Sequence, residues 1–306
     1  MIQSGRGLGI VVAGWSRVGG GLVAGCWRFA GRCGRSFAAR PVLGYPHEMT
    51  AATSTPALWA TVPCKGRLAF TQQTAPSVLA QDMGYCLVDF YCPDRCGDWL
   101  ERSFASAIAR GRAIVVRAGE RRHFHKAAAH NLGARRAIAA GAQHLVFLDA
   151  DTLCRPGLAA WLTSRLEQER FWIAGLDADG WERAALVGVL ALPALVFQRS
   201  GGFDEAFRDW GAEDLEYRLR LHLGLGLDFG EIPVELLHGL PHDDELRVRH
   251  YEIKDLERSH LRNQVYMARK LRRELGVGLG ALGPRAQRLI RRIRRAAAPD
   301  AVEVAR

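Results

Sequence analysis

The sequence has little lysine, no Cys-x-x-Cys pair and no hydrophobic run long enough to cross a membrane. Only four of its 42 basic residues are lysine, and we interpret the excess of arginine as a coding bias. Seven cysteines occur without a Cys-x-x-Cys pair. Cys92 and Cys96 have no second pair at zinc-ligand spacing. The sequence therefore does not favour a structural zinc site, and reduced thiols in the cytoplasm are the expectation.

The central part of the chain also lacks an excess of positive charge. Residues 1–48 contain six arginines and one glutamate, and residues 258–306 contain thirteen basic and three acidic residues. Taking these +5 and +10 from the net charge of +10 leaves −5 for the residues between them. A body of this charge lacks the basic surface of a nucleic-acid-binding protein, so no nucleic-acid partner is expected.

The two basic ends are expected to lie outside one central domain, which a chain of 306 residues can readily form. Residues 1–55 are predicted to be a disordered extension, or one never translated if synthesis starts at Met49. A targeting segment is a further alternative, since such segments are rich in arginine and poor in acids. The apolar stretches 8–15 and 21–27 are each too short to span a bilayer.

Residues 56–256 are predicted to form the domain, and residues 257–306 a basic helical tail. The tail is interrupted at 276–284, and its last part places Leu289, Ile290 and Ile293 on one side of a helix. Such a segment could lie peripherally on the anionic inner face of a membrane, or it could be a solvated terminal helix.

Apolar stretches alternate with helical patterns from residue 58 onward. Such alternation predicts βαβ units, an α/β fold and a parallel sheet. Predicted strands cover 58–62, 84–92, 113–117, 145–148 and 171–176, and predicted helices cover 67–80, 99–109, 126–140 and 158–169. The apolar run 184–197 is broken by Gly188 and Pro193 and is left unassigned.

Two carboxylates follow the buried strand at 145–148 directly, in the stretch Asp149-Ala150-Asp151. In open α/β sheets, ligands bind at the carboxyl ends of the strands. Oxygen ligands at that edge suit Mg²⁺ or Mn²⁺ shared with the phosphates of a nucleotide. A solvated turn explains the same pair equally well, so further residues have to decide.

A second dense stretch contains Gly201-Gly202-Phe203-Asp204-Glu205 and Trp210-Gly211-Ala212-Glu213-Asp214. A helix is predicted to begin near Glu213, with one apolar stripe containing Leu215 and Leu219. Acidic residues in a first turn are also favoured by the helix dipole alone. Three histidines follow, at 238, 242 and 250.

In this order, these motifs resemble those of family 2-type glycosyltransferases with the GT-A fold and a galactosyltransferase-type C-terminal motif. The resemblance covers residues 58–250. It implies a Rossmann-like nucleotide-sugar-binding fold, with a mixed, mostly parallel central sheet flanked by helices. It further implies an inverting, Mn²⁺- or Mg²⁺-dependent enzyme that moves a hexosyl or N-acetylhexosaminyl group. The donor would be a nucleotide sugar, with UDP-sugars first, and the acceptor a glycan, polysaccharide or glycolipid.

The resemblance also assigns roles at the reacting end. Asp151 would bind the metal that bridges the diphosphate, and Asp149 would contact the donor sugar or ribose and help to hold the metal. Asp214 would be the general base, with Glu213 bonding acceptor or donor hydroxyls beside Trp210 and Gly211. His238 is the first choice for a third metal ligand and His242 the second, while His250 is expected to be structural.

The nucleotide end is assigned in the same way. Pro63, Arg67, Asp89, Lys126 and Asn131 are expected to contact the donor, with Asp94 an alternative to Asp89. Asn131-Leu132-Gly133 matches the family's Asn-x-Gly, but His130 stands where relatives carry arginine, which puts one phosphate contact in doubt. Ordinary surface charge is the competing explanation for Arg67 and Lys126.

Two other function classes compete with a glycosyltransferase. A nucleotidyltransferase on a similar sheet would not need residues 210–214 and would release pyrophosphate. A non-catalytic glycan-binding or scaffold protein would not need the four carboxylates at 149, 151, 213 and 214. The sequence specifies neither the sugar, the acceptor nor the linkage.

Overall fold

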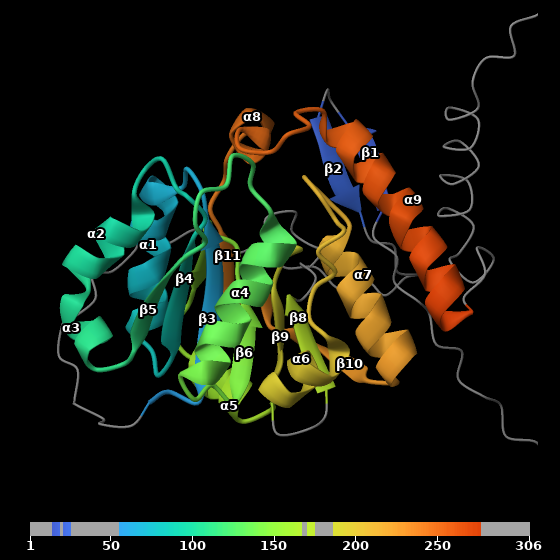
Figure 1. The fold of residues 1–306 in the computed structure, drawn as a ribbon. Helices are drawn as coiled ribbons and strands as arrows, with labels where there is room; N and C mark the ends of the chain where they lie inside the picture. The colour runs from blue at the N-terminus through green and yellow to red at the C-terminus, as the bar shows by residue number, and fades with distance from the viewer. Residues whose placement is uncertain (1–13, 19–20, 26–54, 167–169, 175–185, 277–306) are drawn as a thin grey trace, which may run out of the picture.

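A computed structural model describes residues 14–18, 21–25, 55–166, 170–174 and 186–276 (Figure 1). The helices and strands lie in the order β1 Gly14–Val18, β2 Gly21–Gly25, β3 Leu58–Cys64, α1 Leu68–Leu79, β4 Gly84–Asp89, α2 Cys96–Ser103, α3 Ala105–Ala109, β5 Ala113–Arg117, α4 Lys126–Ala139, β6 His144–Phe147, β7 Thr152–Cys154, α5 Leu158–Thr163, β8 Arg170–Ala174, β9 Leu190–Pro193, α6 Ala194–Ser200, α7 Glu213–Leu219, a π-helical turn Arg220–Gly224, β10 Asp228–Ile232, a 3₁₀ turn Val234–Leu236, β11 Leu237–Gly239, α8 Asp244–Val248 and α9 Leu256–Leu275.

A seven-stranded mixed sheet forms the centre, in the order β10-β8-β9-β6-β3-β4-β5. β6, β3, β4 and β5 are parallel neighbours, and so are β10 and β8, whereas β9 is antiparallel to both of its neighbours. Helices pack on both faces (Figure 1). The predicted mixed, mostly parallel sheet flanked by helices is confirmed.

Strict alternation along the central strands produces this three-layer arrangement. In β3, Leu58 and Ala60 face the core under α1 and α5, whereas Trp59 faces the core under α4 and α6. β6 follows the same rule, with Val146 on the first face and Leu145 and Phe147 on the second. A strand buried on both faces reads as a continuous apolar run, which is why the sequence predicts it well.

Pro63 lies at the end of β3, where a missing N–H group is tolerated. The pairing of β3 with β6 ends at Thr61, and only the pairing with β4 continues to Cys64. Proline is accepted in a sheet at such one-sided positions. The turn after β3 therefore begins at the edge where the carboxyl ends of β3, β4 and β6 meet.

The predicted element boundaries differ from the structure in a few places. The strand expected at 84–92 ends at Asp89, and the helix expected at 99–109 is divided into α2 and α3. The unassigned run 184–197 contains β9 and the start of α6, separated at Pro193, whose fixed φ suits a helix start.

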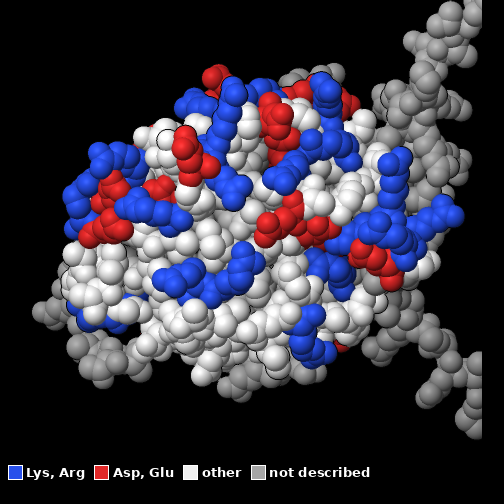
Figure 2. Space-filling view, viewed as in Figure 1, with Lys and Arg blue, Asp and Glu red and all other residues white. Residues whose placement is uncertain are grey.

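The two ends of the chain are described only in part. β1 and β2 form an antiparallel pair within residues 1–55, and α9 covers the first half of the predicted tail. The amphipathic stretch with Leu289, Ile290 and Ile293 lies outside the described residues, so a membrane contact there stays a prediction. No helix among the described residues is long and apolar enough to cross a membrane. Acidic and basic side chains are interspersed over the viewed face of the molecule (Figure 2).

Candidate functional site

A pocket of about 150 Å³ opens at the carboxyl ends of β3 and β6 and the start of α7. It brings together most of the residues that the motifs single out, namely Pro63, Arg67, Lys126, Asp149, Asp151, Trp210, Gly211, Glu213, Asp214 and His242. The two motifs are 62 residues apart in the sequence when counted from Asp151 to Glu213. The two carboxylate pairs therefore form one site.

Lys126, the first residue of α4, connects the two pairs. Its Nζ lies 2.9 Å from Oδ1 of Asp149 and 3.4 Å from Oε1 of Glu213. The Lys126 side chain is 13% exposed, that of Glu213 is 7% exposed and that of Asp149 is 30% exposed, so water screens the contact with Glu213 little and the contact with Asp149 more. Lys126 is therefore an internal cation that neutralises part of the carboxylate charge.

The pKa values of this group follow from burial and mutual charge. Burial disfavours the ammonium of Lys126, but Asp149, Glu213 and Asp214 outweigh it and raise the Lys126 pKa well above its usual value. Burial likewise opposes the charged form of Asp149, yet Lys126 keeps the Asp149 pKa below its usual value. For Glu213, burial prevails and raises the pKa to about 7, with Asp214 adding to the rise. Asp149 is therefore a carboxylate, while Glu213 can exchange a proton near neutral pH.

Gly188, in the turn before β9, makes room for the Lys126–Asp149 contact. A Cβ atom at this position would lie 2.4 Å from Oδ2 of Asp149 and 2.8 Å from Nζ of Lys126. Because real Cβ atoms do not approach other heavy atoms so closely, any other residue would displace the ion pair. In the sequence, Gly188 stands out only as a break in an apolar run.

Asp151 occupies the other side of the pocket, next to His242. The turn that carries it is held by two bonds, from Thr74 Oγ1 to the Ala150 carbonyl and from the Leu240 N–H to the Asp151 carbonyl. Oδ2 of Asp151 lies 2.7 Å from Nε2 of His242, whereas its Oδ1 is buried and has no hydrogen-bond partner among the described residues. A buried, unpartnered carboxylate oxygen is costly unless a ligand completes it.

The position of His242 follows from a short two-stranded pairing. β7 starts directly after Asp151 and pairs antiparallel with β11, with His238 opposite Leu153. The chain then leaves β11 and returns past Asp151, which places His242 against the carboxylate. His238, the first choice from sequence, is not among the residues that line the pocket. The structure therefore places His242, the second choice, beside Asp151 in the pocket, and its role as a metal ligand stays a prediction.

Arg67 and His250 extend the pocket toward the turn after β3. Nη1 of Arg67 is buried without a hydrogen-bond partner among the described residues, and burial lowers the pKa of the guanidinium against the pull of Asp151. An unpaired guanidinium N–H at a pocket wall is suited to a phosphate oxygen. His250 lines the same wall, and its Nε2 would collide with a Cβ at Gly66.

The loop before α7 adopts an unusual backbone that aims Glu213 and Asp214 into the pocket. Asp209, Gly211 and Ala212 all have positive φ, at 57°, 99° and 72°. For a residue with a Cβ such a conformation costs about 1 kcal/mol or more. Hydrogen bonds from helix α9 hold the loop in this conformation.

Helix α9 supplies the bonds that hold this loop. Ser259 bonds both the N–H and the carbonyl of Trp210, and the side-chain amide of Asn263 donates to the carbonyls of Arg208 and Gly211. Arg262 pairs with Asp209 at 3.1 Å. The beginning of the predicted tail therefore packs against the domain and holds the loop that borders the pocket.

The aromatic ring of Trp210 is part of the pocket wall. Its centroid is 5.2 Å from that of His260, and the guanidinium of Arg247 lies 5.9 Å from the same ring. Asp214 lines the same pocket, and its Oδ1 accepts the Leu215 N–H. The pocket therefore combines an aromatic side chain with carboxylates, as ligand sites with a few orienting polar groups do.

Two predicted donor residues do not line this pocket. Asn131 is buried, and its amide bonds the Phe203 backbone at both ends, at 2.8 Å each, and also Oε1 of Glu205. It therefore joins α4 to the Gly201–Glu205 motif. Gly133, on the same helix, lets α4 approach the sheet, because a Cβ there would lie 2.9 Å from Val88.

Asp89 is buried at the end of β4 and accepts the N–H groups of Cys92 and Gly97 and a bond from Arg117. Asp89 lines a second, open pocket of about 800 Å³. Two residues, Lys65 and His250, line both this pocket and the first one. Nζ of Lys65 is fully used by the carbonyls of Phe90, Tyr91 and Arg121. The two pockets are thus neighbours that share one wall.

Within the first pocket, the side chains fit a divalent ion at Asp151 but not at Asp149. Asp151 offers a buried, unpartnered oxygen next to the imidazole of His242, an oxygen and nitrogen donor set that Mn²⁺ accepts. Asp149 instead uses both oxygens on Lys126. A metal ion here would be held by Asp151 and His242, and Asp149 would join them only if its pairing with Lys126 were loosened.

Several lining residues were not identified from sequence. Lys65, Phe124, Gly188, Leu246, Arg247, Tyr251 and His260 have no motif around them. They come from loops and from α8 and α9, which are distant in the sequence from the strands whose ends form the pocket. The positive-φ loop 209–212 could have been suspected from its glycine, but Asp209 and Ala212 give no such signal.

Comparisons with known proteins identify the fold. No protein-family model matches the chain, and no curated protein matches it by sequence. Full-length S. aureus TarS is similar over 81% of this chain and 46% of TarS, at 9% identity and a TM-score of 0.52. The chain thus spans about half the length of full-length TarS. Residues 1–349 of TarS match 77% of this chain and 78% of that fragment, at 9% identity and a TM-score of 0.45.

The catalytic domain of Drosophila β1,4-galactosyltransferase 7, solved with xylobiose, is also similar in structure. It covers 65% of this chain and 75% of its own, at 17% identity and a TM-score of 0.45. The likeness to full-length TarS and the topology of the central sheet agree with the predicted fold class. The described part of the chain therefore has the GT-A fold.

Proposed function

We propose that the chain is a glycosyltransferase that moves a hexosyl or N-acetylhexosaminyl group from a nucleotide sugar to a glycan, polysaccharide or glycolipid. The observation that carries the proposal is the convergence of Asp149-Ala150-Asp151 and Glu213-Asp214 on one pocket, with Lys126 between them. In chain order, Asp149 and Asp151 would form the half of the pocket that binds the donor, and Glu213 and Asp214 the half that binds the acceptor.

The donor is placed on the side of the β3 and β6 ends. Arg67, with a buried guanidinium nitrogen free for a further bond, faces the leaving diphosphate together with Asp151 and His242. A divalent ion, Mn²⁺ or Mg²⁺, would supply Lewis-acid neutralisation of the departing diphosphate. The neighbouring pocket at Asp89 has room for the nucleoside, since it shares the wall formed by Lys65 and His250. A fragment of TarS is solved with UDP-GlcNAc, so UDP-sugars come first in the donor panel.

The acceptor is placed between Trp210 and Asp214. Asp214 takes the proton of the attacking hydroxyl as general base, which corresponds to an inverting transfer. Glu213 is held by Lys126 and bonds a hydroxyl of donor or acceptor through its buried, unpartnered Oε2. Asp149 is fixed by Lys126 in its ionised form and faces the donor sugar or ribose.

Two measurements test the proposal. In a thermal-shift panel of nucleoside-diphosphate sugars, one donor should raise the melting temperature, and more so with Mn²⁺, because stabilisation follows affinity. Asp214→Asn should bind that donor as the wild type does and lose turnover by several decades. Asp243→Asn, at the exposed cap of α8, is the matched control and should keep full turnover. Near-normal turnover of Asp214→Asn would remove Asp214 from the role of base.

A further inference from the structure

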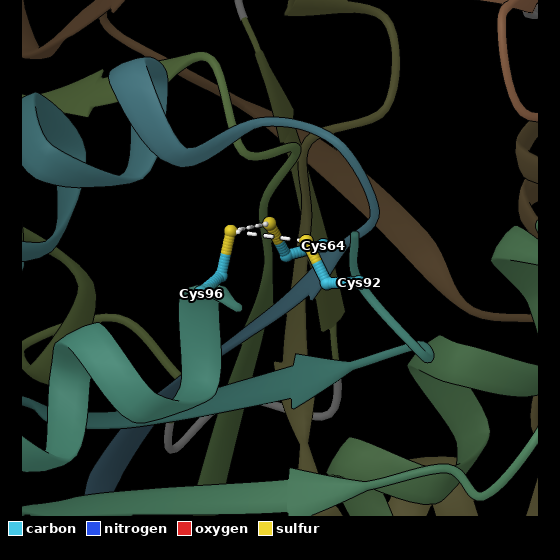
Figure 3. Close-up of side chains that lie close together, drawn as sticks. All are labelled: Cys64, Cys92 and Cys96. Atoms are coloured by element: carbon cyan, nitrogen blue, oxygen red, sulfur yellow. Dashed lines mark hydrogen bonds between the residues drawn. The ribbon is translucent and has the colours of Figure 1, made fainter. Parts of the chain in front are cut away.

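Three cysteines from three separate elements meet beside the active pocket. Cys64 ends β3, Cys92 lies in the loop after β4, and Cys96 begins α2 (Figure 3). The Sγ atom of Cys96 lies 3.1 Å from that of Cys64 and 3.2 Å from that of Cys92. Their ligand atoms all lie within 4.8 Å of one another. No other group of three or more histidine, cysteine or acidic side chains among the described residues is gathered this closely.

The distances fit sulfurs that surround one ion. Thiolates bound to a common tetrahedral Zn²⁺ at about 2.3 Å lie roughly 3.8 Å apart. Two of the sulfur–sulfur distances, 3.1 and 3.2 Å, are somewhat shorter than this separation, and all three sulfurs lie within 4.8 Å of one another. The two distances are far longer than the ~2.05 Å of a disulfide. The spacing Cys92-x₃-Cys96 also falls within the range usual for two zinc ligands on one turn, with Cys64 completing a set of three.

The surroundings hold the sulfurs in place. The Gly66 N–H donates to Sγ of Cys92 at 3.1 Å, and Thr71 Oγ1 lies 3.4 Å from Sγ of Cys64. Hydrogen bonds of this kind to sulfur orient thiolate ligands and tune the bound metal. The loop between Cys92 and Cys96 contains Arg95 at φ 54°, a left-handed turn that returns the chain to the cluster.

We propose that Cys64, Cys92 and Cys96 bind a structural Zn²⁺ ion as three thiolates. Water or the nearby His250 can take the fourth position. The ion ties the carboxyl ends of β3 and β4 to the start of α2, and thereby fixes the turn that carries Pro63 and Arg67 into the active pocket. It is separate from the divalent ion at Asp151 and His242, because soft thiolates select zinc and hard oxygens select Mn²⁺ or Mg²⁺.

The test is the zinc content of the full chain, purified without metal-affinity resin, loaded with Zn²⁺ and dialysed. Elemental mass spectrometry should find close to one zinc per wild-type chain, and Cys92→Ser should lower the content tenfold or more. Cys154→Ser is the matched control, because Cys154 is equally buried and lies outside the cluster. His242→Ala should also keep its zinc, which separates this site from the proposed catalytic ion.

A second measurement needs no variant. Alkylation of the native wild-type chain, read by peptide mass spectrometry, should be slow at all three cluster cysteines and accelerate at least tenfold after removal of zinc by a chelator. Cys86 and Cys154 are buried without neighbouring thiols and should stay slow under both conditions. Zinc-free wild-type protein after loading, alkylation unchanged by the chelator, or a Cys92–Cys96 or Cys64–Cys96 disulfide in the native chain would each overturn the proposal.

Discussion

Replacement of Lys126 by methionine is the most informative single perturbation of the charge cluster. The substitution keeps the length of the side chain but removes the cation between Asp149 and Glu213. At contacts of 2.9 and 3.4 Å, each ion pair amounts to roughly 5 kcal/mol of attraction at an effective dielectric constant near 20. The desolvation of the charges offsets part of this, and loss of one partner of a buried pair typically costs about 3–5 kcal/mol.

The stability lost in Lys126→Met should depend on pH, because Asp149 and Glu213 can take up protons. Lys126 is the main charge that holds the Asp149 pKa down, and it also opposes the rise of the Glu213 pKa. Without it, both groups take up protons at higher pH, and the protonated forms no longer need a cation. We expect Lys126→Met to lower the free energy of unfolding by about 3–5 kcal/mol at pH 8 and by much less at pH 5.

The free energy of unfolding of both proteins is measured at pH 5 and pH 8 by urea unfolding, followed by tryptophan fluorescence. No divalent cation is added. Lys254→Met is the control, because Lys254 lies outside the pocket and contacts only backbone carbonyls of Val248 and Arg249. An equal loss at pH 5 and pH 8, or no loss at pH 8, would refute the view that Lys126 serves to balance the two carboxylates.

Three further predictions concern the same pocket. Glu213→Gln should become more stable than the wild type as pH rises from about 4.5 to 7, by on the order of 3 kcal/mol in unfolding experiments. The reason is that between about pH 4.5 and 7 the folded wild type keeps a Glu213 proton that the unfolded chain has lost, so wild-type stability falls across this range while the glutamine variant, which does not titrate, shows no such fall; a parallel pH dependence of both proteins would contradict it. His242→Ala should raise the Mn²⁺ concentration needed for half-maximal turnover tenfold or more, whereas His238→Ala should not; the reverse result would restore His238 as ligand. Gly188→Ala should lower turnover at least tenfold, since its Cβ displaces the Lys126–Asp149 pair, and wild-type turnover would show that the turn moves freely.

The sheet and both halves of the site were predictable because local sequence determines them. Leu145 to Phe147 lie in β6, a strand buried on both faces that reads as an apolar run whatever surrounds it, and Asp149 and Asp151 follow directly after the buried Leu148. Glu213 and Asp214 were predicted in a helix first turn and are found there. That the two pairs meet in one pocket followed from the family resemblance, not from periodicity.

The rest depended on contacts between distant segments. Which of His238 and His242 lies beside Asp151 depends on the pairing of β7 with β11, two strands of three residues that have no recognisable pattern. Asn131 matched a donor motif, yet its amide is used by Phe203 and Glu205 because α4 turns that face toward the 201–205 loop.

The cysteines show the same limit. Cys92 and Cys96 have no second pair near them in the sequence, but the third sulfur comes from Cys64 on a neighbouring strand. Parallel strands bring their carboxyl ends together at one edge, so ligands can converge there from distant positions. Spacing along the chain alone does not reveal such a group.

The most direct test of the central claim is the identity of the small product released from the donor. The wild-type chain, incubated with the nucleotide sugar that stabilises it, Mn²⁺ and a glycan acceptor, should release a nucleoside diphosphate and extend the acceptor by one sugar. Asp151→Asn should lower both products together by a hundredfold or more. Release of pyrophosphate would identify a nucleotidyltransferase, and glycan binding with no product from any donor would identify a non-catalytic protein; either result contradicts the account.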